Sequence, residues 1–277
     1  MSADDFRWID SHCHLTAPDF DADRDQALAR ARQAGVDVLL VIGSGYGLGD
    51  LAAVAALARR EQGIYASAGV HPHDARLWSA DAADRVAAVL DDPQVVAVGE
   101  CGLDYWYENS PREAQRRALA DQLAIARERD LPVSLHVRDR EEDAYAELLD
   151  LWRSEGRGRL QGVLHCYTHT EAYARRALDL GLMVSFSGIL TFKRDRGLRE
   201  VARALPLSEL MVETDAPLLA PEGHRGRRNE PARVVQVGEA LAATQGVPVD
   251  EVAAATSANA RRLFRLPDGL AEEAWRR

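Results

Sequence analysis

The chain has 277 residues, of which 47% are hydrophobic, and it carries a formal net charge of −10 at pH 7. This length and composition support a sizeable core in one large domain or two modest ones. The acidic total argues against a protein that coats nucleic acid through bulk charge, although it leaves room for an enzyme with a local basic groove. Because the chain has no long apolar run and no apolar signal region, we expect a cytoplasmic protein without a membrane span.

Short apolar segments alternate with Ala-, Leu- and Arg-rich segments of helical periodicity along the whole chain. Strands are predicted at 7–10, 36–42, 64–68, 95–99, 132–136, 160–165, 182–187 and 208–213. Helices are predicted at 22–34, 49–61, 80–90, 112–130, 141–154, 170–180 and 197–205, and two more follow at about 231–245 and 249–260. Eight strand–helix alternations predict an α/β protein, a (β/α)8 TIM-type barrel with additional C-terminal helices, with a doubly wound open sheet as the alternative. We expect a single domain over 1–277, with a core from about 7 to 265 and a tail at 266–277.

Histidines and carboxylates collect where these predicted strands end. His12 and His14 follow the first strand, and residues two apart in a strand point to the same side, so the two rings project together. The later strands end in His71 and His73, in Glu100 and Asp104, in His136, in His165, and in Glu213 and Asp215. Because the C-terminal strand ends of a barrel meet at one mouth, these side chains are predicted to form one cluster.

The predicted cluster has the chemistry of a metal site. Four histidines and two carboxylates suffice for two divalent ions that share one carboxylate. Glu100 is the expected bridge, because it has two oxygens and ends a central strand. Asp215 is expected to be a ligand and the general base that takes a proton from the attacking water, with a helix N-cap as its alternative role. Such sites accept Mg, Mn or Zn, among other ions, so the sequence leaves the metal open.

Three cysteines and one aspartate lie next to the expected ligands. Cys13, Cys101 and Cys166 each follow one of them, and strand alternation turns the thiols away from the site. They are expected to be small buried hydrophobes, with a thiolate ligand or a redox role as the alternative. Asp10 is expected to hydrogen-bond a ligand histidine and thereby fix its tautomer.

Taken together, these motifs resemble the TatD-type metal-dependent deoxyribonucleases, a branch of the amidohydrolase-like barrels. The matching segments are Asp10-Ser-His-Cys-His-Leu15, Gly69-Val-His-Pro-His73, Val98-Gly-Glu-Cys-Gly-Leu-Asp-Tyr105, Leu131-Pro-Val-Ser-Leu-His136, His165-Cys-Tyr-Thr168, Ser187-Gly-Ile-Leu-Thr-Phe-Lys193, Glu213-Thr-Asp-Ala-Pro217 and Arg225-Gly-Arg-Arg-Asn-Glu-Pro231. The resemblance runs from about Ile9 to about Phe264 and implies a somewhat distorted barrel. It implies one metal on His12, His14, Glu100 and Asp215, and a second on Glu100, His136 and His165.

A phosphodiester substrate needs groups that neutralise its phosphate oxygens. The expected substrate-binding residues are His71, Lys193, Arg225 and Arg228. The two arginines follow the eighth strand and the lysine follows the seventh, and a guanidinium matches phosphate bidentately. The alternative for each arginine is an ordinary solvated charge. The aromatic residues expected near the mouth, on which bases could stack, are Tyr105, Trp106, Tyr107, Tyr167 and Phe192.

The resulting hypothesis is a monomeric, cytoplasmic two-metal hydrolase that cleaves phosphodiester bonds, with Glu100 and Asp215 as catalytic residues. The resemblance implies DNA as the substrate and 3′-to-5′ exonuclease action on single strands. One alternative is a metal-dependent hydrolase of another ester or amide, including an aminoacyl-tRNA ester. Another is a non-catalytic barrel that binds a partner.

Overall fold

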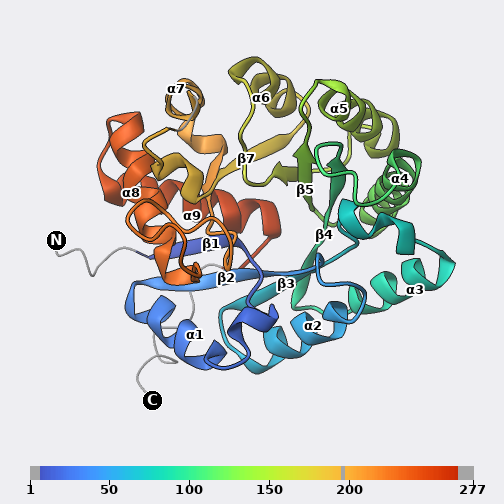
Figure 1. The fold of residues 1–277 in the computed structure, drawn as a ribbon, viewed down its shortest axis with the longest axis horizontal. Helices are drawn as coiled ribbons and strands as arrows, with labels where there is room; N and C mark the ends of the chain where they lie inside the picture. Colours follow the sequence, from blue (N-terminus) through green and yellow to red (C-terminus); the bar gives the residue numbers. More distant parts are fainter. Residues whose placement is uncertain (1–6, 195–196, 268–277) are drawn as a thin grey trace.

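Eight parallel strands pair in chain order around the molecule (Figure 1). The computed structural model describes residues 7–194 and 197–267, so positions 268–277 of the expected tail lie outside the described residues. The strands are β1 (Trp8–Cys13), β2 (Val36–Gly43), β3 (Ile64–Ala68), β4 (Val95–Asp104), β5 (Val133–Arg138), β6 (Gly162–Leu164), β7 (Leu182–Phe186) and β8 (Leu210–Val212).

Helices follow the strands and surround the sheet (Figure 1). They are α1 (Arg24–Gln33), α2 (Asp50–Arg60), α3 (Ala80–Val89), α4 (Arg112–Arg129), α5 (Asp143–Gly156), α6 (Glu171–Leu178), α7 (Leu198–Ala204), α8 (Val234–Gln245) and α9 (Val249–Phe264). Short 3-10 turns lie between them, among them η3 (Pro72–Leu77), η4 (Gly188–Thr191) and η6 (Pro231–Arg233). Across the part of the chain that the structure describes, no helix has the length and apolar character needed to cross a bilayer.

The first and last strands approach each other closely enough to make a nearly closed barrel. Beyond the end of β8, the backbone N–H of Asp215 donates to the carbonyl of His12 (2.9 Å), and the N–H of His14 donates to the carbonyl of Ala216 (2.7 Å). The buried carboxylate of Asp10 accepts the backbone N–H of Thr214 (2.9 Å) as well. The predicted barrel is therefore confirmed, and the open sheet is wrong.

Helix α9 packs against the end of the barrel where the strands begin. The inward-facing side chains of the strands form an apolar cluster of their own, which includes Ile9, Leu40 and Met211. Leu263 and Phe264 of α9 belong to the same cluster and are almost fully buried. Because this end of the interior is filled by apolar side chains, only the opposite end, where the strands terminate, is left for polar groups.

Strand β4 is longer than predicted, and its pairing is irregular at Glu100. Gly99 pairs with Ser134 of β5 and Cys101 pairs with Leu135, which leaves Glu100 as an extra residue between them. The strand then continues to Asp104, so neither Glu100 nor Asp104 lies where the sequence placed it, at a strand end and in a loop. Extra residues of this kind re-aim a side chain next to many active sites.

Candidate active site

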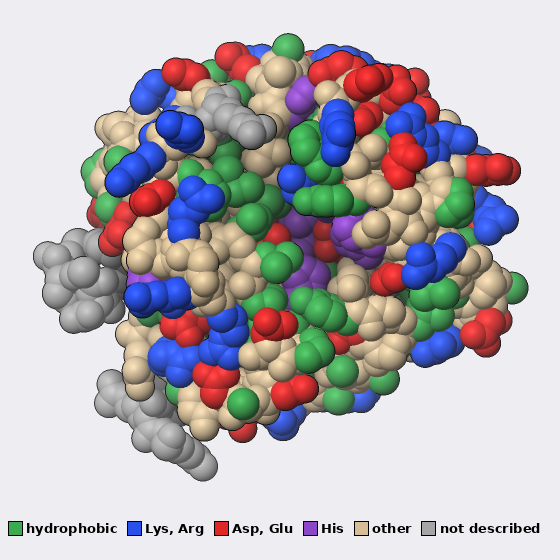
Figure 2. Space-filling view, in the orientation of Figure 1, with side chains coloured by type: hydrophobic (Ala, Val, Ile, Leu, Met, Phe, Trp, Pro, Cys, Tyr) green, Lys and Arg blue, Asp and Glu red, His purple; other side chains and the backbone are tan. Residues whose placement is uncertain are grey.

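The predicted ligands meet at the C-terminal ends of the strands. Figure 2 shows histidines gathered in a hollow at the centre of this face, with acidic atoms among them and hydrophobic side chains around the rim. The histidines and carboxylates that the structure brings together here are His12, His14, His71, His73, Glu100, Asp104, His136, His165, Glu213 and Asp215. Strand-end reasoning therefore found the members of this cluster.

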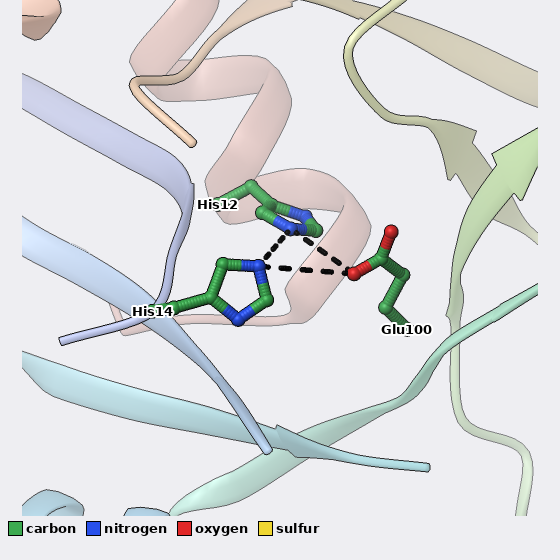
Figure 3. A group of neighbouring side chains, drawn as sticks. All are labelled: His12, His14 and Glu100. Carbon is green, nitrogen blue, oxygen red and sulfur yellow. Dashed lines mark hydrogen bonds and ion pairs between the residues drawn. The ribbon is translucent and has the colours of Figure 1, made fainter. Parts of the chain in front are cut away.

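One group of donor atoms is formed by His12, His14, Glu100 and Asp215. The two Nε2 atoms of the histidines are 3.3 Å apart, and Glu100 Oε2 lies 3.5 and 3.8 Å from those of His12 and His14. Asp215 Oδ1 lies 3.7 and 3.5 Å from the same two atoms. Figure 3 shows both rings, from β1 and the residue after it, turned toward the Glu100 carboxylate from β4.

A second group of donor atoms surrounds the other oxygen of Glu100. Oε1 lies 2.7 Å from His165 Nε2 and 3.0 Å from His136 Nδ1, and these two nitrogens are 3.4 Å apart. The carboxylate of Glu100 is almost fully buried between the two groups. Burial alone would raise its pKa, but the surrounding histidines, His165 foremost, hold the pKa well below its usual range. Glu100 is therefore ionised and faces both groups at once.

The donor atoms of both groups fit divalent metal ions. Two ligands of a tetrahedral ion with bonds of about 2.1 Å lie about 3.4 Å apart, close to the separations observed here. Imidazole nitrogen and carboxylate oxygen are ligands that Zn, Mn and related ions accept. Three overlapping sets of residues have donor atoms within 4.8 Å of one another: His12 with His14 and Glu100, His12 with His165 and Asp215, and His71 with Glu100 and His136.

Glu213 orients His165. Its Oε1 lies 3.2 Å from His165 Nδ1 and accepts the backbone N–H of Cys166 (2.8 Å). With its Nδ1 proton held by a carboxylate, a neutral His165 presents the lone pair of Nε2 to Glu100 and the second group. The sequence placed Glu213 in the cluster without a role, and this contact supplies one.

Asp104 stands in the same relation to His136. Its Oδ2 lies 3.1 Å from His136 Nε2 and 2.9 Å from His73 Nε2. Burial would raise the pKa of Asp104, but the hydrogen bonds from His136 and then His73 hold the pKa well below its usual range. Its other oxygen accepts the backbone N–H groups of Trp106 (3.0 Å) and Tyr107 (2.9 Å). Asp104 thus fixes the orientation of His136 and the turn that follows β4.

The tautomer of His71 makes it a donor. The backbone N–H of His73 donates to His71 Nδ1 (3.0 Å), so in the neutral ring the proton is on Nε2. Burial lowers the pKa of His71 to about 4, which keeps the ring neutral near pH 7. Nε2 lies 3.4 Å from Glu100 Oε1 and offers a hydrogen atom there, whereas a metal ligand would need a lone pair.

Comparison with known proteins decides the family. The sequence profile described as TatD related DNase matches residues 9–265. The chain belongs to the TatD-related deoxyribonuclease family. It is 40% identical to the 3′-5′ ssDNA/RNA exonuclease TatD of Cronobacter turicensis, over 92% of this chain and 97% of that protein. It is 34% identical to the uncharacterized metal-dependent hydrolase YabD of Bacillus subtilis, over 93% of this chain and 99% of that protein.

A solved structure agrees with this TatD-family assignment. The crystal structure of YJJV, a TatD homolog from Escherichia coli K12, superposes with a TM-score of 0.87 at 34% identity. The match covers 94% of this chain and 99% of that chain. The predicted family and the predicted class, a hydrolase, are therefore confirmed.

Asp10 does not have the role predicted for it in this TatD-family barrel. Its carboxylate accepts both the backbone N–H and the hydroxyl of Thr214 (2.9 and 2.5 Å), and the backbone N–H of His12 (3.3 Å). It therefore ties β1 to the segment after β8. The Nδ1 atom of the His12 ring instead lies 3.4 Å from the hydroxyl of Ser134 in β5.

Of the basic residues expected to bind substrate, Arg225 and Lys193 are exposed in loops that follow β8 and β7. The guanidinium carbon of Arg225 lies 4.1 Å from the ring centroid of Phe192. Arg228 instead binds both carboxylate oxygens of Asp23 (2.5 and 2.8 Å), so its guanidinium holds the loop against the start of α1.

The sequence reasoning passed over two arginines at the end of β5. Arg138 lies against the rings of Trp106 and Tyr107, in the turn after β4, and Arg140 lies against the ring of Trp106. The signal was present in the chain, because both arginines follow His136 within four residues. It was missed because basic residues were sought only in the loops after the seventh and eighth strands.

Two of the three cysteines lie behind the site, as predicted, whereas Cys166 follows the end of β6 and is only partly buried. Cys13 and Cys101 are fully buried in the apolar layer between strands and helices. The Cys166 thiol lies 3.2 Å from the hydroxyl of Ser187, and burial raises its pKa to about 12. A thiol in this state is a poor ligand and a poor nucleophile.

Proposed function

We propose that this TatD-family hydrolase uses two divalent ions to remove nucleotides from the 3′ ends of single-stranded DNA and RNA. The observation that carries the proposal is the position of Glu100, whose two carboxylate oxygens each face a separate group of donor atoms. The preference for single strands and the 3′-to-5′ polarity are those of the Cronobacter relative, a 3′-5′ ssDNA/RNA exonuclease. A monomer and a cytoplasmic location remain predictions.

The residues proposed to hold the first ion are His12, His14, Glu100 and Asp215, and those proposed for the second are Glu100, His136 and His165. Bound divalent ions would neutralise the phosphoryl oxygens and make a water molecule acidic enough to attack at neutral pH. Mg, Mn and Zn all suit this mixed set of donors.

Asp215 is the proposed general base. Burial would raise its pKa, but the hydrogen bond to His14 and the charges of nearby histidines lower the pKa below its usual value, so the carboxylate is ionised at pH 7. It can therefore accept the proton of the attacking water. His71 is neutral with its proton on Nε2, and we propose that this N–H turns from Glu100 Oε1 to a phosphoryl oxygen of the bound substrate.

The first test is a nuclease assay with metal-stripped protein. End-labelled single-stranded DNA is incubated with added Mg, Mn or Zn, and the same assay is run with His136→Ala and with the control His224→Ala. His224 contacts Gln236 outside the cluster. We expect metal-dependent loss of 3′-terminal nucleotides in the wild type and the control, with a loss of at least about 10²-fold in His136→Ala.

The alternative chemistry gives a different result in the same assay. If the wild type binds metal but leaves DNA and RNA intact, the phosphodiester assignment is wrong, and another ester or amide becomes the substrate to test. Full activity of His136→Ala would contradict the proposed ligand set instead.

A further inference from the structure

Four side chains form an arginine–aromatic cluster at the ends of β4 and β5. The guanidinium carbon of Arg138 lies 5.3 Å from the ring centroid of Trp106 and 5.2 Å from that of Tyr107. The guanidinium carbon of Arg140 lies 4.6 Å from the Trp106 ring. Both arginines and Tyr107 are exposed at the rim of the mouth. A guanidinium that lies over an aromatic ring is held in place by that contact. Its N–H groups, which lie at the edge of the group, stay available to bind an acceptor.

The side-chain donors of these two arginines find no acceptor among the residues that the structure describes. Over residues 7–194 and 197–267, neither guanidinium donates a hydrogen bond or forms an ion pair with a described residue. Two nearby carboxylates have other partners: Asp139 accepts the backbone N–H of Arg140, and Glu142 binds His169. An oriented guanidinium with free N–H groups is a binding group for phosphate.

Asp104 holds this cluster at a fixed position relative to the proposed metal site. One of its oxygens lies 3.1 Å from His136, and the other accepts the backbone N–H groups of Trp106 and Tyr107. A single carboxylate therefore separates the aromatic turn from a proposed metal ligand. A nucleotide next to the scissile phosphate would lie within reach of the cluster.

A comparable pair lies three strands farther around the barrel, where Arg225 stacks on Phe192. His165, a proposed metal ligand, directly follows β6, which lies between β5 and β7 in the sheet. An extended strand that crosses the mouth from Arg225 to the arginine–aromatic cluster would therefore meet a basic group on each side of the reacting phosphate.

We propose that Arg138 and Arg140, held by Trp106 and Tyr107, bind the backbone phosphates of nucleotides adjacent to the scissile one. The enzyme therefore selects oligonucleotides over small phosphodiesters. This inference rests on the proposed function for its biological meaning, but the binding of single-stranded nucleic acid phosphates can be measured without catalysis.

The test is a binding titration in EDTA. A fluorescent oligothymidylate is titrated at several salt concentrations with the wild type, with Arg138→Met/Arg140→Met, and with the control Arg153→Met/Arg159→Met. The control makes the same change in charge at exposed positions at the opposite end of the barrel, at the end of α5 and just after it. Each phosphate contact on a single strand contributes about 0.7 to the slope of log K against log salt. We expect the first variant to lose about 1.4 of that slope and about tenfold in affinity, and the control to lose neither.

Three results would overturn the inference: no binding by the wild type, an unchanged slope in Arg138→Met/Arg140→Met, or an equal loss in the control. A second measurement separates the inference from the proposed function. With metal added, the variant is expected to raise KM for an oligonucleotide about tenfold and to leave kcat/KM for bis(p-nitrophenyl) phosphate unchanged. Equal loss on both substrates would show disturbed chemistry and contradict the inference. If the variant loses affinity and salt dependence as expected but the wild type hydrolyses neither substrate, the inference stands and the phosphodiester function is refuted.

Discussion

The side chain of Glu213 shows how much of this site depends on residues that would touch no metal. Its carboxylate is fully buried, and one oxygen is shared between the His165 ring and the backbone N–H of Cys166. The other oxygen has no hydrogen-bond partner among the described residues. A carboxylate behind a ligand histidine fixes the ring and raises its basicity.

We predict that Glu213→Gln lowers metal affinity about 10- to 100-fold, because the amide can no longer fix the His165 tautomer as a carboxylate does. Isothermal titration of metal-free protein with Zn or Mn measures this. Glu142→Gln is the control, since Glu142 binds the peripheral His169. Unchanged affinity in Glu213→Gln would refute a role in orienting His165.

Residue-scale reasoning from the sequence predicted which histidines and carboxylates cluster, but it did not predict their surroundings. His12, His136 and His165 could be predicted because each ends a strand, and strand ends converge in a barrel. The partner of Arg228 could not, because Asp23 lies about two hundred positions away and either partner alone is an ordinary surface charge. The role of Asp10 was misjudged for the same kind of reason, since its partner Thr214 is distant in sequence.

At the scale of elements, the loop after β8 is fastened to α1 by charges. Asp23, which precedes α1, binds Arg228 and Arg30, and Arg30 also binds Glu230. The hydrogen bond from Arg228, followed by that from Arg30, lowers the pKa of Asp23 below its usual range. A carboxyl group whose pKa is lower in the folded state stabilises the fold above its unfolded pKa of about 3.9.

We predict that Asp23→Asn lowers Tm at pH 7 and that the difference from the wild type shrinks as the pH falls below about 4, because the unfolded chain then binds a proton at Asp23 while the folded carboxylate still resists protonation. Asparagine is an equally good residue before a helix, so the change isolates the ion pairs. Thermal unfolding at several pH values measures this, with Asp84→Asn on the exposed face of α3 as the control. A constant difference across the pH range would contradict the explanation.

The boundaries of helices and strands were predicted well where the apolar period was clear. They were predicted poorly where contacts between neighbouring strands of the barrel set the length of a strand. Strand β4 was expected to end at 99, but it continues to Asp104 because Gly102 permits close contact with β5. A β-carbon at Gly102 would lie 1.8 Å from the carbonyl oxygen of His136, and its φ of +151° is one that other residues rarely adopt. The residues around Gly102 in the sequence do not predict this close contact between β4 and β5.

At the scale of the molecule, the apolar side chains that stabilise the barrel interior and the ionisable groups of the candidate site lie at opposite ends of the barrel. The strand termini carry the ionisable groups, and α9 closes the other end with apolar side chains. Phe264 is one of the largest buried side chains in the protein and belongs to the interior cluster with Leu40 and Met211.

We predict that Phe264→Ala lowers the free energy of unfolding by about 3–5 kcal/mol while the folded protein keeps its metal affinity. The loss of a buried ring leaves a cavity at the end of the barrel farthest from the ligands. Urea unfolding and metal titration measure the two quantities, with the exposed Leu77→Ala as the control. Parallel losses of stability and metal affinity would show that the two ends are coupled.

The position of α9 also sets an order of assembly during synthesis. Every strand, and every residue proposed to hold a metal, leaves the ribosome before residues 249–264 do. Until those residues emerge, the inward-facing apolar side chains of the nascent barrel have no cover at one end. Translation of α9 is therefore the step that covers this end of the barrel interior with apolar side chains.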